Sequence, residues 1–203
     1  MNLSMLYEKL LKEFGRQNWW PMIRGFRPKE WEVCLGAVLT QNTNWKNVEK
    51  ALENLKKKGV LSPQDIVETN TSTLQNLIRP SGFYRQKAER LKTLATFVLG
   101  FGDFERFKRG VKREELLKVK GIGFETADSI LLYACGRPHF VIDAYTKRFT
   151  RNLGIKTKMD YESLRKFFEE NLPKDLGVYK EFHALIVEWG KRGKGLYRSP
   201  AKN

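Results

Sequence analysis

Apolar residues recur at helical spacing along nearly the whole chain, and no other feature limits the possible folds as strongly. The clearest runs are Val48, Ala51, Leu52 and Leu55; Leu91, Leu94, Ala95 and Val98; and Phe182, Leu185, Ile186 and Trp189. Steps of three and four residues keep one face of a helix in a core. No segment shows the period-2 alternation of a strand. The sequence therefore predicts an all-α protein.

Two segments mark where helices should begin and end. Ser62 is a good N-cap, and Pro63 after it suits the first helical position. The segment 79–82, Arg-Pro-Ser-Gly, should stop one helix before the next begins near Phe83 and Tyr84. No repeats or low-complexity stretches interrupt this pattern.

The chain is long enough to fold without covalent cross-links, since 203 residues should bury about 70% of the unfolded surface. Its two cysteines, Cys34 and Cys135, lie in apolar helical contexts, which favours reduced core residues over a disulfide. No signal peptide is visible, and no apolar run approaches the roughly 18 residues of a membrane span. We therefore expect a cytoplasmic protein without a membrane partner.

The charge balance indicates a polyanionic partner. The sequence has 38 Lys and Arg against 23 Asp and Glu, a net charge of +15. Basic residues gather at 106–113, at 147–151 and in the tail from Lys191 to Lys202. Any one of these clusters, taken singly, is better explained as a solvated helix face. Together they favour nucleic acid.

The stretch 117–148 places a tight glycine turn between two helical patterns and an aspartate shortly afterwards. Gly121, Ile122 and Gly123 form the turn, and a helix should open at the second glycine. Glycine lets the backbone approach a phosphate, and the free N–H groups at a helix N-terminus point toward an anion. Asp143 then follows a short apolar segment, His139-Phe140-Val141-Ile142. A plain turn between packed helices, and a plain helix cap at Asp143, are the alternatives.

The hairpin, the helix after it and the segment Val141-Ile142-Asp143-Ala144-Tyr145-Thr146-Lys147-Arg148 together resemble the helix-hairpin-helix DNA glycosylase superfamily. That superfamily includes endonuclease III and the 3-methyladenine glycosylases. The resemblance implies that Asp143 is the catalytic carboxylate. It also implies that the DNA backbone is gripped by Lys120, Gly121, Ile122, Gly123, Glu125 and Thr126.

The same resemblance implies a two-lobed architecture with the active-site cleft between the lobes. Residues 28–138 would form a barrel-like helical lobe that contains the hairpin. Residues 1–27 and 139–203 would form a second helical lobe that carries Asp143. The composition itself shows no linker.

An enzyme that acts on a base in duplex DNA must extrude the base and fill the gap. Gln41 matches the glutamine that related enzymes insert into DNA. The turn around it could instead be an ordinary helix start, since Thr43 or Asn44 could cap a helix beginning at Trp45.

Two departures from the family pattern narrow the chemistry. Bifunctional relatives carry a lysine two positions after the second hairpin glycine, and here that position is Glu125, so we expect base removal without strand cleavage. Many endonuclease III relatives also hold an iron-sulfur cluster on four cysteines, and this chain has no cysteine after Cys135. We expect neither a cluster nor a zinc site. A monovalent cation at the hairpin is compatible with this expectation.

The base pocket is predicted from tryptophans. Trp19, Trp20 and Pro21 follow the N-terminal helix, and Trp45 follows Gln41. An indole face attracts a cationic alkylated purine and stacks on it, although ordinary core filling explains tryptophans as well. Lys191 is better explained as a solvent or phosphate contact, while Glu188, Glu125 and Asp128 are acids that could favour a cationic base.

The sequence resembles most closely the endonuclease III-like 3-methyladenine glycosylases that lack the cluster. This implies a monomeric, monofunctional DNA glycosylase of base-excision repair that binds double-stranded DNA, flips the damaged base and hydrolyses its N-glycosidic bond. Its substrates would be 3-methyladenine and also 7-methylguanine. The alternatives are the same fold acting on mismatched or oxidised bases, and a non-catalytic helix-hairpin-helix DNA-binding module.

Overall fold

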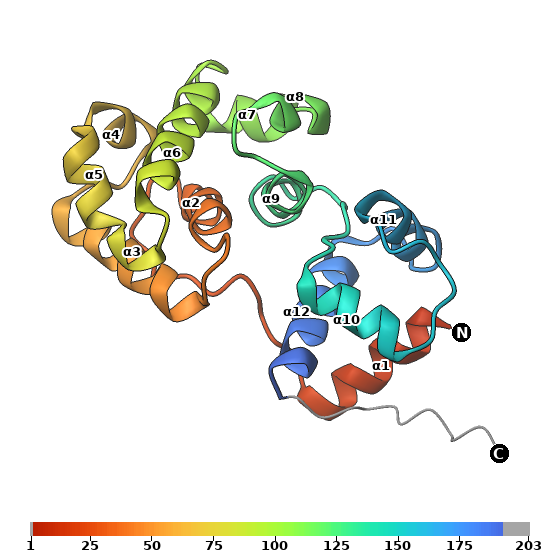
Figure 1. The fold of residues 1–203 in the computed structure, drawn as a ribbon. Coiled ribbons are helices and arrows are strands. Elements are labelled where there is room, and N and C mark those ends of the chain that lie inside the picture. The colour runs from red at the N-terminus through yellow and green to blue at the C-terminus, as the bar shows by residue number, and fades with distance from the viewer. Residues whose placement is uncertain (1, 193–203) are drawn as a thin grey trace. The chain divides into compact units, whose positions relative to one another are not determined.

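The computed structural model describes residues 2–192, and these are helical without a strand, which confirms the predicted fold class (Figure 1). The α-helices are α1 (Leu3–Phe14), α2 (Trp31–Leu39), α3 (Trp45–Lys58), α4 (Pro63–Glu68), α5 (Thr71–Leu77), α6 (Tyr84–Leu99), α7 (Phe104–Gly110), α8 (Arg113–Lys118), α9 (Phe124–Ser129), α10 (Ala144–Asn152), α11 (Tyr161–Glu170) and α12 (Leu176–Arg192). A short 3-10 turn, η1, covers Arg79–Ser81, and a π-helical turn, η2, covers Ile130–Ala134.

The chain divides into two compact units. The first combines Met1–Trp19 with Arg137–Asn203, and the second is the continuous segment Trp20–Gly136. The sequence-based division into 28–138 and 1–27 with 139–203 sets both boundaries slightly later in the chain. Residues 193–203 of the predicted second lobe, and with them most of the basic tail, lie outside the described part.

The Trp20–Gly136 unit is built around α2. Every residue of α2 is buried, because its sequence is apolar on all sides except at Glu32. Helices α3 and α6 and the turn η2 contact α2, and α4 and α5 pack on α6 (Figure 1). The carboxylate of Glu32 accepts the backbone N–H groups of Ile23 and Arg24, which satisfies the one buried charge of this helix.

The other unit is centred on α12, which packs against α1 and α10. Aromatic side chains fill its core: the Phe140 and Phe168 rings stack with centroids 4.4 Å apart, and Phe182 lies edge-on to both. Aromatic pairs of this kind contribute beyond the area they bury. The segment that leads to Asp143 is therefore packed into this aromatic core, where Phe140, Val141 and Ile142 are buried.

Local signals set several helix ends as predicted. Ser62 and Asp65 form a reciprocal capping box with Pro63 at the first helical position, which confirms that start. Helix α5 ends at Leu77, η1 follows, and α6 begins at Tyr84, so the predicted break around 79–82 is also confirmed. Asn44 caps α3, as the alternative explanation of that turn proposed.

Cys34 is buried, and no disulfide joins it to Cys135. Burial raises the pKa of the Cys34 thiol well above its ordinary value, so the side chain behaves as a small apolar residue. Among residues 2–192, no helix combines the length and the apolar character needed to cross a membrane.

Candidate functional site

Asp143 is the N-cap of α10. Its Oδ1 accepts hydrogen bonds from the Thr146 backbone N–H at 2.7 Å and from Thr146 Oγ1 at 2.9 Å. This confirms the capping role that the sequence offered as an alternative. The cap uses only one carboxylate oxygen, so Oδ2 is directed elsewhere, and capping does not prevent a chemical role.

A histidine that the sequence analysis did not single out faces the second oxygen. His183 of α12 places Nε2 3.5 Å from Asp143 Oδ2, and its side chain is only 4% exposed against 15% for Asp143. Burial by itself would raise the pKa of Asp143, but the contacts with His183 and Thr146 outweigh it and hold that pKa below its ordinary value. The carboxylate is therefore ionised at neutral pH.

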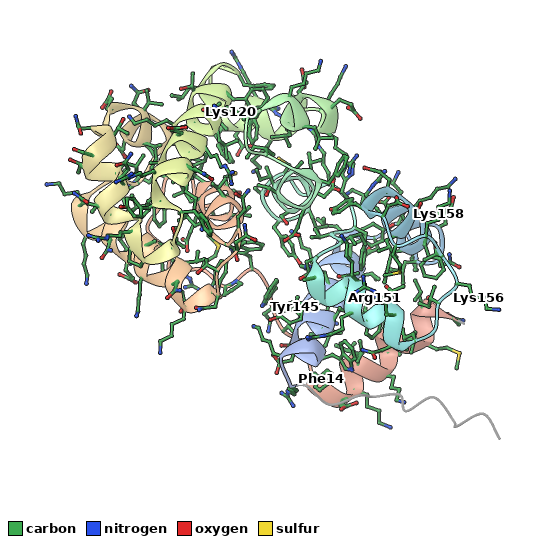
Figure 2. The ribbon with its side chains drawn as sticks, in the orientation of Figure 1. Phe14, Lys120, Tyr145, Arg151, Lys156 and Lys158 are labelled. Carbon is green, nitrogen blue, oxygen red and sulfur yellow. The ribbon has the colours of Figure 1, made fainter. Side chains whose placement is uncertain are left out.

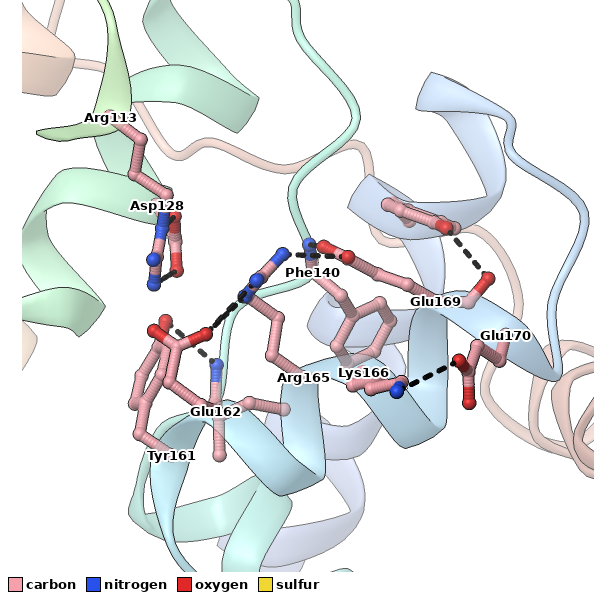
Figure 3. Close-up of polar contacts among 11 residues, drawn as sticks. Arg113, Asp128, Phe140, Tyr161, Glu162, Arg165, Lys166, Glu169 and Glu170 are labelled. Carbon is pink, nitrogen blue, oxygen red and sulfur yellow. Dashed lines mark hydrogen bonds and ion pairs between the residues drawn. The ribbon is translucent and has the colours of Figure 1, made fainter.

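Helix α11 fixes the extended segment before Asp143 (Figure 3). Glu169 accepts the Phe140 backbone N–H at 2.9 Å, and the Tyr161 hydroxyl lies 3.4 Å from the Ile142 nitrogen. Arg165 bridges Glu162 and Glu169 on the same helix and so orients the accepting carboxylate. These contacts join residues about 20 to 30 positions apart and set where the chain presents Asp143.

The glycine turn has the predicted form. The Ile122 N–H donates to the Val119 carbonyl at 3.0 Å, and Gly123 caps α9 from an extended conformation. Gly121 has φ +88°, which favours glycine, whereas a methyl group at Gly123 would meet no atom. Lys120 is exposed (Figure 2). Gly123 is exposed as well. The hairpin therefore has an open backbone surface at its tip.

Gln41 lies against this hairpin. Its Nε2 donates to the Gly121 carbonyl at 3.2 Å and to Thr126 Oγ1 at 2.9 Å. Its Oε1 accepts a hydrogen bond from the Arg90 guanidinium of α6. The structure thus brings together two features that the sequence placed 80 residues apart and adds Arg90, which the sequence analysis missed.

Lys87 was also missed. Its buried ammonium donates to the Leu39 carbonyl at 2.8 Å and to the Ser81 carbonyl at 2.6 Å, and so ties the end of α2 to η1. Burial and the neighbouring Arg90 lower the pKa of Lys87 to about 8. A signal was present, because Lys87 precedes Leu91 and Leu94 at helical spacing on the apolar face of α6.

The turn that Lys87 anchors ends in an exposed aromatic residue. Phe83 is 62% exposed and has φ +45°, which is rare for a bulky residue. Lys87 joins this turn to the end of α2 that leads into Gln41. Lys87 thus connects the turn that carries Phe83 to the turn that carries Gln41, and both turns belong to the same unit.

The predicted pocket residues fall into two groups. Trp20 contacts Trp45 edge-on, with centroids 5.2 Å apart, and its ring lies 5.0 Å from that of Tyr133, which the sequence analysis had not named. Gly36 permits this cluster, since a methyl group there would press against both indoles at 3.2 Å. Pro21 follows Trp20 and is half-buried.

Trp19 belongs to the other unit and contacts His183, the residue that faces Asp143. Its ring is edge-on to His183, with centroids 5.6 Å apart. Lys191 is exposed, and its Nζ lies 5.8 Å from the centre of the Trp19 ring, within cation–π range. The lysine therefore contacts an indole as well as solvent.

Not every charged residue that the sequence offered is available to a ligand. Asp128 is fully buried and accepts two hydrogen bonds from Arg113, at 2.6 and 2.9 Å, so both residues are used inside the fold. Glu188 pairs with Arg192 at 2.7 Å. Arg148 donates to the Gly190 carbonyl and so links α10 to α12. Exposed cations remain near the end of α10 and in the loop after it, among them Arg151, Lys156 and Lys158 (Figure 2).

The donor set does not suit an iron-sulfur cluster, which needs four thiolates, because the whole sequence has two cysteines. Within residues 2–192, no three side chains among His, Cys, Asp and Glu are grouped so that they could hold a metal ion.

Comparisons with known proteins agree on one family. The model of the HhH-GPD superfamily of base excision DNA repair proteins matches residues 35–174. A protein of Methanocaldococcus jannaschii named as a DNA repair glycosylase is 48% identical over 92% of this chain and 86% of its own length. Endonuclease III of Thermotoga maritima is 32% identical over 79% of this chain and 72% of its own. The crystal structure of H. pylori 3-methyladenine DNA glycosylase (MagIII) bound to 1,N6-ethenoadenine superposes with a TM-score of 0.83, at 38% identity over 96% of this chain and 97% of that one.

Proposed function

This chain belongs to the HhH-GPD superfamily of base excision DNA repair proteins, and on that premise we propose that it is a monofunctional DNA glycosylase that excises alkylated purines. The proposal names 3-methyladenine as the main substrate and 7-methylguanine as a second one. The observation that carries it is the ionised Asp143 carboxylate, held at the start of α10 between Thr146 and His183.

The ionised state of Asp143 suits glycosidic bond cleavage. As the bond between C1′ and the base nitrogen breaks, its electron pair leaves with the base and positive charge develops on the sugar. A fixed carboxylate stabilises that charge, and it can also orient the water that adds to C1′ and then releases a proton to the solvent. A depressed pKa keeps the group anionic, which an electrostatic role requires and a proton-donor role would not.

The aromatic residues support a cationic substrate. Alkylation at N3 or N7 gives a purine a positive charge, which makes it both a better leaving group and a better partner for an indole face. Trp20 and Trp45 are half-buried indoles of one unit, and Trp19 lies beside His183 in the other. The similarity to a 3-methyladenine glycosylase favours the same substrate class.

DNA binding is proposed to use the hairpin as the backbone grip, with Gln41 as the residue that fills the vacated space. The open backbone at Gly123, the cap of α9, supports the grip. Phe83 is a second candidate filler, because it exposes a large ring on a turn that Lys87 ties to the end of α2. Base stacking on such a ring needs no sequence preference.

The proposal is tested by base release from methylated genomic DNA. Wild-type protein should release 3-methyladenine, identified by chromatography. Asp143→Asn should reduce release at least 100-fold, a typical effect of removing an electrostatic catalytic group, while duplex binding stays near the wild-type value. Binding without any released base would indicate a non-catalytic DNA-binding module. Release only from mismatched or oxidised duplexes would show that the substrate is not an alkylated purine. An Asp143→Asn variant with the wild-type rate would remove Asp143 from the mechanism.

A second experiment separates base removal from strand cleavage. The hairpin position that carries the Schiff-base lysine in bifunctional relatives is the exposed Glu125, which cannot supply an amine. Borohydride added during turnover should therefore trap no covalent protein–DNA adduct. A bifunctional glycosylase run in parallel provides the positive control, and a trapped adduct with this chain would assign the nucleophile to another amine.

A further inference from the structure

The amide of Gln41 is held by three partners, all within the Trp20–Gly136 unit. Both of its N–H groups have acceptors, the Gly121 carbonyl at 3.2 Å and Thr126 Oγ1 at 2.9 Å. Its oxygen accepts from Arg90. These partners also fix which end of the amide is which, because a guanidinium can only donate and a carbonyl can only accept.

Arg90 holds this arrangement from two sides. Its guanidinium bonds the Gln41 oxygen, and its side-chain stem lies so close to Gly121 that a methyl group there would collide with Cγ, Cδ and Nε. The one side chain thus contacts both the proposed filler and the proposed grip. Helix α6 supplies it, although neither feature belongs to that helix.

We propose that Arg90 is a positioning residue that locks the Gln41 amide onto the hairpin, so that gap filler and backbone grip form one preassembled unit before DNA binds. This inference rests on the proposed glycosylase function. It assigns Arg90 an action through Gln41 and not a direct contact with a phosphate.

The physical gain is preorganisation. A glutamine side chain loses rotamer entropy when it is ordered, and a side chain ordered during folding does not lose it again on binding. The position of Arg90 beside the buried Lys87 supports a geometric role. Burial lowers the pKa of Lys87, and repulsion from Arg90 lowers it further, because two cations placed together disfavour each other. A cation that served only to attract DNA would be favoured at a position without a buried lysine beside it.

A double-mutant cycle between Arg90 and Gln41 tests the proposal. The variants are Arg90→Met, Arg90→Lys, Gln41→Ala and the combination of Arg90→Met with Gln41→Ala. Each is measured for duplex affinity across a salt series and for single-turnover base release. Arg16→Met serves as the matched control, because it removes the same charge from an exposed side chain outside the three basic clusters. Thermal unfolding of every variant establishes that it is folded.

Arg90→Met should slow base release about tenfold in the wild-type background and change it less than twofold in the Gln41→Ala background. Arg90→Lys should resemble Arg90→Met, since an ammonium keeps the charge but not the planar geometry. The salt slope of binding should match that of Arg16→Met. Additive effects, rescue by Arg90→Lys, or a slope reduced by about 1 in Arg90→Met alone would instead identify a phosphate contact and overturn the proposal.

The cycle remains informative if the glycosylase function itself is wrong. Wild-type protein that releases no base would contradict the proposed function, but coupling between Arg90 and Gln41 would still appear in duplex affinity. Non-additive affinities with no base release would therefore preserve the positioning role and reject the enzyme. Additive affinities together with normal base release would reject the positioning role of Arg90 and support the glycosylase function.

Discussion

At the scale of single residues, Asp143 combines a structural and a chemical role. One carboxylate oxygen caps α10 through Thr146, and the other faces His183 at 3.5 Å. Asparagine caps a helix about as well as aspartate, so the Asp143→Asn variant retains the cap and loses the charge. The two roles can therefore be separated by one substitution.

The depressed pKa of Asp143 predicts how this charge affects stability. The ionised form is favoured in the folded state, so its contribution is complete above the unfolded aspartate pKa of about 3.9 and is lost as the pH falls through the lower folded value. Urea unfolding of wild type and Asp143→Asn should show a stability difference in favour of wild type at pH 6 to 7 that shrinks in this acidic window. A difference that is constant with pH would mean that the ionised carboxylate does not stabilise the fold.

At the scale of elements, the hairpin depends on helix α6 as well as on its own glycines. Arg90 packs on Gly121, and Lys87 of the same helix joins α2 to η1. The turns that carry Gln41 and Phe83 and the hairpin itself are thus all anchored to one helix. Burying an ammonium group is costly, and the bonds from Lys87 to the Leu39 and Ser81 carbonyls offset part of that cost.

The two hairpin glycines should respond differently to alanine. Gly121 has φ +88° and would bring a methyl group into Arg90, whereas Gly123 has an ordinary backbone conformation and open space. Gly121→Ala should lower the free energy of unfolding by about 1–3 kcal/mol, and Gly123→Ala by less than about 0.5 kcal/mol. Denaturant unfolding of both variants measures this contrast. Equal losses would show that Arg90 does not constrain Gly121.

At the scale of the whole molecule, the excess of positive charge is the property that bears most directly on DNA binding. Some of the cations are used inside the fold, as in the pairs of Arg113 with Asp128 and of Lys108 with Glu30. The net charge of +15 counts these acids already, so a large unpaired excess remains. Such an excess attracts DNA independently of sequence.

Duplex affinity should therefore fall steeply with salt. Each phosphate neutralised contributes about −0.9 to the log–log slope, so we expect a slope steeper than about −3. Fluorescence anisotropy with undamaged duplex across a salt series measures it, and Asp143→Asn should give the same slope because it changes no phosphate contact. A slope near −1 would mean that the basic residues are mainly a solvated surface.

The sequence by itself determined the helical class, the capping box at Ser62 and the glycine turn that opens α9, because each depends on residues within about one helical turn of each other. It also singled out Asp143 and Gln41. Only the tertiary structure decided what these side chains contact: His183 beside Asp143, Arg90 and the hairpin around Gln41, and Arg113 around Asp128. Such partners are separated by many residues, and helical packing alone brings them within a hydrogen bond, which no local pattern specifies.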